Sequence, residues 1–145
     1  MKSKLGSCEV KGDREMRRRL AALVAQFPQA IKKAVYIEAE LIMADSKENY
    51  VPKDDGVLYR SGIVEPPVID GINIWVRMGF GGAAMDYAEV VHEHPSGLSP
   101  AVWKGKVINW SIPGTGPKYL EIPFRKAEKG QANRIARTIK AETGL

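Results

Sequence analysis

Cysteine is nearly absent from this sequence, because Cys8 is the only one among 145 residues. A disulfide framework within one chain is therefore impossible, and a reducing compartment is the simpler expectation. Histidine is almost as scarce, with only His92 and His94. A metal site would have to take its remaining ligands from aspartate and glutamate.

Long apolar runs are missing too. No run approaches the roughly 18–20 residues that a membrane-spanning helix needs, and the basic start of the chain lacks the apolar region of a signal peptide. We therefore expect no contact with a membrane, and a protein that acts where it is made or in an assembly built there.

The sequence also lacks the motifs of nucleophilic catalysis and nucleotide binding. It contains no G-x-S-x-G segment and no recognisable Cys–His–Asn arrangement. The glycine-rich segments at residues 79–82 and 112–118 do not have the spacing of a dinucleotide or phosphate loop. We therefore expect no enzyme activity and no cofactor.

Acidic residues are outnumbered by basic ones, 17 against 22, and the net charge is +5. A basic balance is compatible with nucleic acid nearby. The run Arg17–Arg19 belongs either to a solvated helix face or to a DNA-binding surface. Because no DNA-reading motif accompanies the run, we favour the solvated face.

Residues 13–50 predict a long helix, because apolar side chains recur every three to four positions. Pro28 either kinks this helix or begins a second one in its first turn. Beyond Pro28 the apolar positions form two stripes, so the second stripe is covered either by another subunit or by the chain's own core. Residues 1–12 read as an N-terminal arm, and residues 13–145 read as a single domain.

The rest of the chain predicts short strands followed by a helix. Residues 61–82 read as strand, turn and strand, with Pro66 and Pro67 at a sheet edge or a strand end. Residues 95–117 predict an extended loop or hairpin, and the last segment predicts a helix that begins or breaks at Pro123. This order favours an α+β fold, in which a long N-terminal helix and a C-terminal helix pack on a small antiparallel sheet.

Both histidines lie in the segment AMDYAEVVHEHPSG (residues 84–97), of which residues 85–92 read equally as helix or strand. A zinc site on a helix needs histidines four positions apart, whereas His92 and His94 are two apart. Acid–base catalysis by Glu89, His92 or Glu93 would need a pocket and groups that position a substrate. We therefore expect neither a metal site nor acid–base catalysis in this segment.

Two of the three tryptophans, Trp103 and Trp110, fall within residues 95–117. Tryptophan is enriched at protein interfaces. The alternative is a loop that folds back and buries both rings in the chain's own core. We favour the interface and name both residues as candidates for it.

Three phrases resemble, in the same order, segments of tailed-bacteriophage neck and tail-completion proteins, a family of head–tail joining or minor capsid components. VPKDDGVLYRS resembles the P-x-x-T-G-x-L-x-x-S turn, GFGGAAMDYAEVVHE the A-x-Y-A-x-x-V-H-E segment, and GPKYLEIP the K-[FY]-L-E-x-P helix start. Asp55 stands where the family usually has threonine, and Tyr59 displaces the following arginine to Arg60. The residues that match are Pro52, Gly56, Leu58, Ser61, Gly79, Phe80, Tyr87, Ala88, His92, Glu93, Lys118, Tyr119, Leu120, Glu121 and Pro123.

The resemblance implies a structural virion protein of α+β fold without catalysis, cofactor or metal. It implies a homo-oligomeric ring at the head–tail junction, between head-closure or connector proteins and tail terminator or tail tube proteins. Six copies are favoured and twelve are the alternative. Packaged DNA would pass through the lumen, and assembly would occur in the host cytoplasm.

In this interpretation Tyr87 and Ala88 pack on the sheet. His92 and Glu93 would form hydrogen bonds that fix the following loop or meet a neighbouring subunit. The alternative function, from a different class, is a basic DNA-binding module without catalytic activity.

Overall fold

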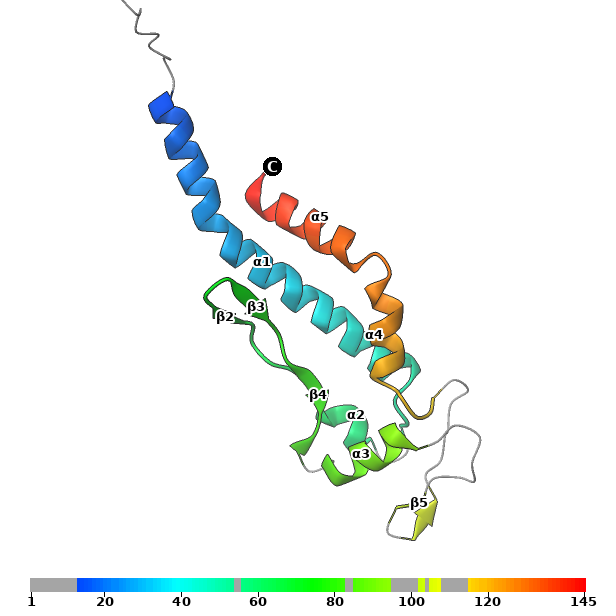
Figure 1. Ribbon diagram of the computed structural model, residues 1–145. Helices are drawn as coiled ribbons and strands as arrows, with labels where there is room; N and C mark the ends of the chain where they lie inside the picture. Colours follow the sequence, from blue (N-terminus) through cyan, green and yellow to red (C-terminus); the bar gives the residue numbers. More distant parts are fainter. Residues whose placement is uncertain (1–12, 54–55, 83–84, 95–101, 104, 108–114) are drawn as a thin grey trace, which may run out of the picture.

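The computed structural model describes residues 13–53, 56–82, 85–94, 102–103, 105–107 and 115–145. These residues form the α+β fold that the sequence predicts, with a long N-terminal helix, short antiparallel strands and helices at the C-terminus (Figure 1). Within this described part of the chain, no helix is long and apolar enough to cross a membrane.

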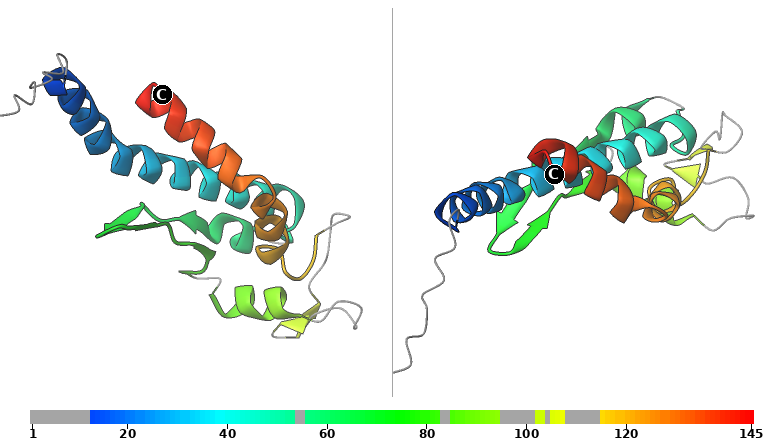
Figure 2. Two further views of the ribbon diagram at one scale, coloured as in Figure 1. Left: turned by 45° about the horizontal axis from the view of Figure 1, so that its top comes forward. Right: turned by 90° about the horizontal axis from the view of Figure 1, so that it is seen from above.

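The spine of the molecule is α1 (Asp13–Asn49), a single helix that contains Pro28. Proline offers no N–H to the helix and its ring crowds the preceding turn. The axis of α1 changes direction in this part of the helix (Figure 2). One long helix with a kink is therefore confirmed, and the alternative that Pro28 begins a second helix is wrong.

Two C-terminal helices, α4 (Glu121–Glu128) and α5 (Gln131–Thr143), return along α1 in the opposite direction. The chain breaks between them at Gly130, whose φ of 81° suits glycine. Pro123 lies in the first turn of α4. N–H groups in a first turn have no acceptor within the helix, so the proline costs α4 no hydrogen bond. The single C-terminal helix expected from the sequence is therefore two. Three ion pairs tie them to α1: Asp45–Lys126 at 3.0 Å, Glu38–Arg134 at 2.8 Å and Lys33–Glu142 at 2.6 Å.

The strands form antiparallel pairs rather than the single small sheet expected from the sequence. The N–H of Glu65 donates to the carbonyl of Arg77 at 2.8 Å between the first two pairs, so both belong to one long hairpin. Pro66 and Pro67 lack the N–H groups that would continue the ladder, and the hairpin is divided at this point. The pairs are β1 (Gly62–Val64) with β4 (Met78–Phe80), β2 (Val68–Asp70) with β3 (Asn73–Trp75), and β5 (Val102–Trp103) with β6 (Lys106–Val107).

A compact core lies at the C-terminal end of α1, where the short helices α2 (Val57–Ser61) and α3 (Met85–Glu93) pack (Figure 1). The segment that reads equally as helix or strand is thus a helix. The buried side chains of this core are Val51, Leu58, Ala88, Val91 and Tyr119.

The other end of α1 stands apart from this body. The N-terminal turns of α1 extend past the end of α5 (Figures 1 and 2). From Arg14 to Gln29 the described side chains are exposed or only half-buried. The helix therefore has a packed C-terminal part and an unsupported N-terminal part.

Candidate functional site

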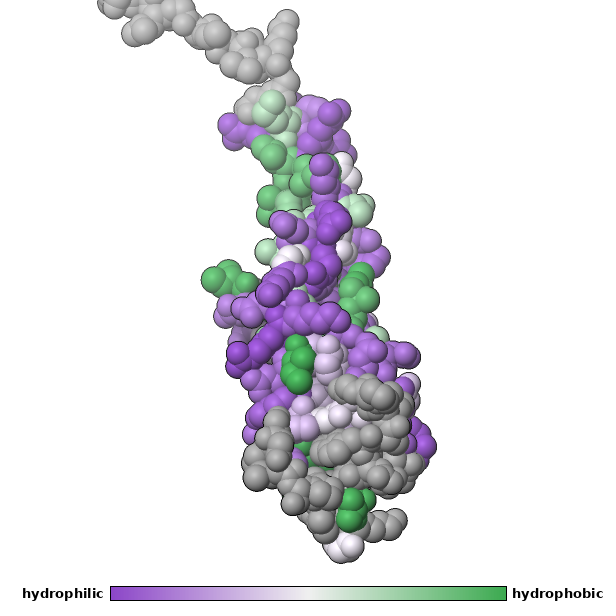
Figure 3. Space-filling model, turned by 90° about the vertical axis from the view of Figure 1, so that its right-hand side faces the viewer, coloured by the Kyte–Doolittle hydropathy of each residue, from purple (hydrophilic) through white to green (hydrophobic). Residues whose placement is uncertain are grey.

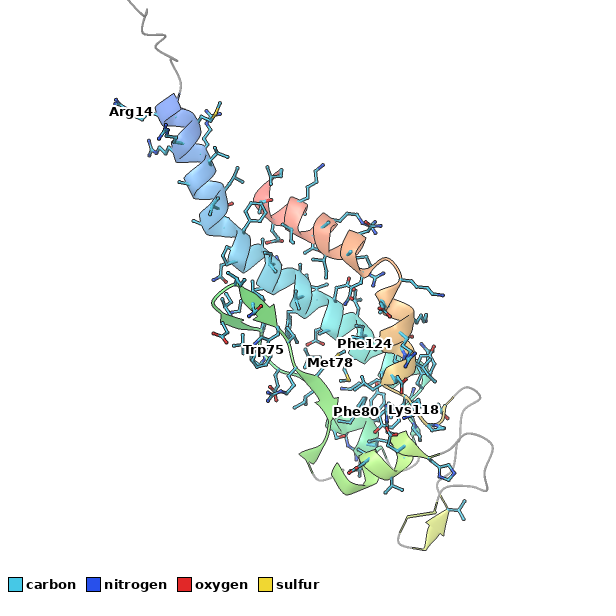
Figure 4. The ribbon with its side chains drawn as sticks, viewed as in Figure 1. Arg14, Trp75, Met78, Phe80, Lys118 and Phe124 are labelled. Carbon is cyan, nitrogen blue, oxygen red and sulfur yellow. The ribbon has the colours of Figure 1, made fainter. Side chains whose placement is uncertain are left out.

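The three segments that carry the family resemblance are far apart in sequence and meet at the core. Leu58 comes from the first, Ala88 from the second and Tyr119 from the third, and all three are buried. Figure 4 shows Phe80 and Lys118 at this end of the molecule, beside α3, and Arg14 at the opposite end. We call this meeting point the Tyr119 cluster, made of Leu58, Ala88, His92, Glu93, Lys118 and Tyr119.

Tyr119 joins the elements of the cluster through both of its polar groups. Its hydroxyl donates to the carbonyl of Ala88 in α3 at 2.8 Å, and its own carbonyl accepts from the buried hydroxyl of Ser46 in α1 at 2.7 Å. The rings of Phe80 and His92 stand edge-to-face against it, with centroid distances of 5.0 and 4.9 Å. A buried tyrosine needs a partner for its hydroxyl, and here that partner fixes α3 against the start of α4.

Glu93 lies at the rim of the cluster and contacts two basic side chains. Lys118 Nζ donates to its Oε2 at 2.6 Å, and His92 Nδ1 lies 2.7 Å from its Oε1. The hydrogen bond from Lys118, followed by that from His92, holds the pKa of Glu93 below its ordinary value. The same bond to Glu93 raises the pKa of Lys118. The three side chains link the end of α3 to the chain just before α4.

The backbone of Lys118 adopts a positive φ of 59°, which is uncommon for a residue other than glycine. This conformation costs about 1 kcal/mol or more. Two backbone bonds hold it: the N–H of Lys118 donates to the carbonyl of His92, and the N–H of Ile122 donates to the carbonyl of Lys118, both at 2.9 Å. The reversal at Lys118 directs the next residue, Tyr119, into the core.

The turn after α1 supplies the remaining wall of the cluster. Gly56 has a φ of 74°, in the left-handed region that favours glycine over residues with a Cβ. The hydroxyl of Ser61 donates to the carbonyl of Leu58 at 2.8 Å and closes α2. Leu58 is thereby held in the core, where it is 1% exposed.

A groove of about 300 Å³ opens beside the cluster and is lined in part by Phe80, Glu89, His92 and Leu120. In the described residues, no group of three His, Cys, Asp or Glu side chains could hold a metal ion. The groove therefore offers an aromatic and aliphatic wall with polar groups at its edge.

Several predicted residues lie partly or wholly outside the described part of the chain. Asp55 and Trp110 are outside it, as are the side chains of Tyr87 and Trp103, although their backbones belong to α3 and β5. The packing expected of Tyr87 and the docking expected of the two tryptophans therefore stay predictions.

Two buried polar residues were missed from the sequence. Ser46 is fully buried against Tyr119, and Glu38 is 4% exposed in α1. Arg134 of α5 donates to the carboxylate of Glu38 from Nε at 2.9 Å and from Nη2 at 2.8 Å. The sequence signal that could have revealed this pair is a glutamate among the apolar positions of a helix. A buried carboxylate requires a cation, so Glu38 predicts a basic partner.

Compared with family models, curated proteins and solved structures, the chain matches none. The functional interpretation therefore depends on the residues and contacts of the chain itself.

Proposed function

We propose that the chain is a structural subunit of a tailed-bacteriophage neck, one copy of a ring that joins the DNA-filled head to the tail. One observation carries the proposal: the three segments that resemble the neck and tail-completion family come together in the Tyr119 cluster. Chance resemblance of short phrases gives no reason for their side chains to share a core. A fold shared with that family would give such a reason.

The chemistry of the cluster supports a structural role over a catalytic one. A general base must direct a basic atom toward a substrate proton. Here Glu93 accepts from Lys118 and lies within hydrogen-bond distance of His92, and the Tyr119 hydroxyl is bonded to the backbone of α3. These groups hold the chain together at the point where α3 ends and α4 begins.

In this role the chain assembles with itself, with six copies favoured and twelve as the alternative. Head-closure or connector proteins would lie on one side of the ring, and tail terminator or tail tube proteins on the other. Packaged DNA would pass through the lumen. The segment 95–117, with Trp103 and Trp110, would dock on one of these neighbours.

The test uses particles of the phage that encodes the chain. A stop codon early in its gene is expected to give DNA-filled heads and separate tails in electron micrographs. Supplying the wild-type chain from a plasmid is expected to restore complete particles. Infectious, complete particles that contain none of the chain by mass spectrometry would refute the proposal.

A basic DNA-binding module is the second candidate, and four exposed arginines near the start of α1 favour it. They are Arg14, Arg17, Arg18 and Arg19. The two functions differ in how the isolated chain binds a short duplex as salt is raised. Tight binding by the monomer with a steep loss of affinity in salt would favour this candidate. The neck proposal expects no tight binding by the monomer at physiological salt.

A further inference from the structure

The N-terminal part of α1 exposes an apolar stripe. We call residues 13–24 the overhang, because the N-terminal part of α1 extends past the end of α5 (Figure 1), which Lys33 and Glu142 tie to α1 at 2.6 Å. Met16, Leu20 and Val24 lie on one side of the overhang and are 64%, 55% and 66% exposed. Figure 3 shows apolar side chains among hydrophilic ones over this upper part of the molecule.

This stripe continues the face that α1 buries in the body of the molecule. Steps of three or four residues lead from Val24 through Phe27 to Ala30 and Ala34, which are 5% and 1% exposed. A short helix without a packed face is marginal in water. The overhang thus exposes the same apolar face that α1 buries further along the helix, and the described residues of this chain do not cover it.

A second exposed face lies further along the same helix and carries the opposite charge. Its positions follow at helical spacing and include no basic residue. Leu41 at its centre is 54% exposed. We call it the acidic face, made of Ile37, Glu40, Leu41, Ala44 and Glu48. The overhang, by contrast, contains four arginines against the two acids Asp13 and Glu15.

We propose that the overhang of one copy packs on the acidic face of a second copy, head to tail. The inference rests on the proposed neck ring and names the surface that closes it. Met16 and Val24 are as far apart in sequence as Glu40 and Glu48, about 12 Å at 1.5 Å per residue. At about 100° per residue, Arg17 and Arg19 lie on the two sides of the stripe, whereas Arg14 and Arg18 lie on the far side of the helix. The two faces therefore match in length, in apolar character at the centre and in opposite charge at the flanks.

Pairing of two overhangs with each other is disfavoured by the same charges. Arg17 and Arg19 of each copy would meet, and like charges across an interface are costly. A contact between two different faces is heterologous, and repetition of such a contact generates either a closed ring or a filament. The overhang and the acidic face therefore provide the kind of contact that a neck ring requires.

A charge exchange between the two faces tests the inference. One variant carries Arg17→Glu and Arg19→Glu, the arginines on the two sides of the stripe, and the other carries Glu40→Arg and Glu48→Arg. All four side chains are exposed, so helix content and melting temperature should stay near those of the wild type. Native mass spectrometry and light scattering of the full chain report self-association over a range of concentrations.

We expect the wild type to form oligomers and each variant alone to associate at least about tenfold more weakly, which is about 1.4 kcal/mol. An equimolar mixture should regain oligomers in which the two variants alternate, because each overhang then meets a face of opposite charge. The matched control, Arg137→Glu with Lys140→Glu on exposed positions of α5, changes net charge as the first variant does and should associate like the wild type.

Three results would overturn the inference. In the first, both charge variants associate like the wild type. In the second, the equimolar mixture stays monomeric. In the third, association is lost instead in the variant Ile72→Lys, at the tip of the β2–β3 turn, where Ile72 is 98% exposed. A wild-type chain that stays monomeric at every concentration would also overturn it. A monomeric wild type would not decide the neck proposal, which the stop-codon experiment on particles tests separately. Failure of this inference and failure of the neck proposal are therefore distinguishable.

Discussion

The hydroxyl of Tyr119 donates a hydrogen bond to the backbone carbonyl of Ala88 across 2.8 Å. The two residues are 2% and 5% exposed and come from different segments of the family resemblance. This bond therefore joins, inside the core, two parts of the chain that the sequence connects only by resemblance. Its removal should loosen α3 against the start of α4.

Tyr119→Phe should lower the free energy of unfolding by about 1 kcal/mol, because it removes one buried hydrogen bond and keeps the ring. Urea unfolding of the purified chain measures the change. Tyr36→Phe is the matched control, since the Tyr36 hydroxyl bonds Glu40 on a half-buried part of α1 and should matter less. Equal losses in both variants would contradict the role given to Tyr119.

Arg134→Ala should destabilise the chain, because it leaves the carboxylate of Glu38, which is 4% exposed, without its cation. The double variant Glu38→Leu with Arg134→Ala should recover much of this loss, since no buried charge then remains. Thermal unfolding of the three proteins tests the pair. A double variant less stable than Arg134→Ala alone would show that a group other than Arg134 also stabilises the Glu38 carboxylate.

The contact of Glu93 with Lys118 should weaken in acid. The pKa of Glu93 is lower in the folded chain than its ordinary value of 4.5, so the folded state binds fewer protons. The stabilisation is complete above pH 4.5 and is lost as the pH falls through the lowered pKa. The difference in melting temperature between the wild type and Glu93→Gln should therefore be present at pH 7 and vanish at the acid end. A difference that persists unchanged there would contradict this assignment.

Trp103→Ala and Trp110→Ala should leave the isolated chain folded and block head–tail joining. A large aromatic anchor contributes on the order of 2 kcal/mol or more at an interface, so its loss should separate filled heads from tails. Circular dichroism and electron micrographs of lysates measure the two effects. Variants that melt much earlier, yet still give infectious particles, would place both rings in the chain's own core.

Much of the fold follows from the sequence because its signals are local. The three-to-four spacing of apolar residues continues through Pro28 and predicts all of α1. Pro66 and Pro67 were predicted at a sheet edge or a strand end, and β1 ends at Val64 just before them. That the hairpin divides into two separate strand pairs was not predicted. The last segment was predicted as a helix that begins or breaks at Pro123, and α4 does begin with Pro123 in its first turn. The break at Gly130 between α4 and α5 was not predicted.

The residues of the site were named from the sequence, but most of their contacts were not. Ser46 and Tyr119 are 73 positions apart, and Glu38 and Arg134 are 96 apart. No local pattern pairs residues at such distances; only the packing of α4 and α5 on α1 brings them together. The hydrogen-bonding role expected of His92 and Glu93 is compatible with the contact at 2.7 Å, whereas Lys118 as the second partner of Glu93 was not foreseen.

Under the proposed function, the most direct test of the central claim is a cryo-EM reconstruction of the neck in particles produced from the genome that encodes this chain. The account predicts a closed ring around the DNA channel, with six copies favoured, whose density fits α1, the α4–α5 pair and the Tyr119 cluster. A neck built entirely from other proteins, in particles that lack this chain by mass spectrometry, would contradict it.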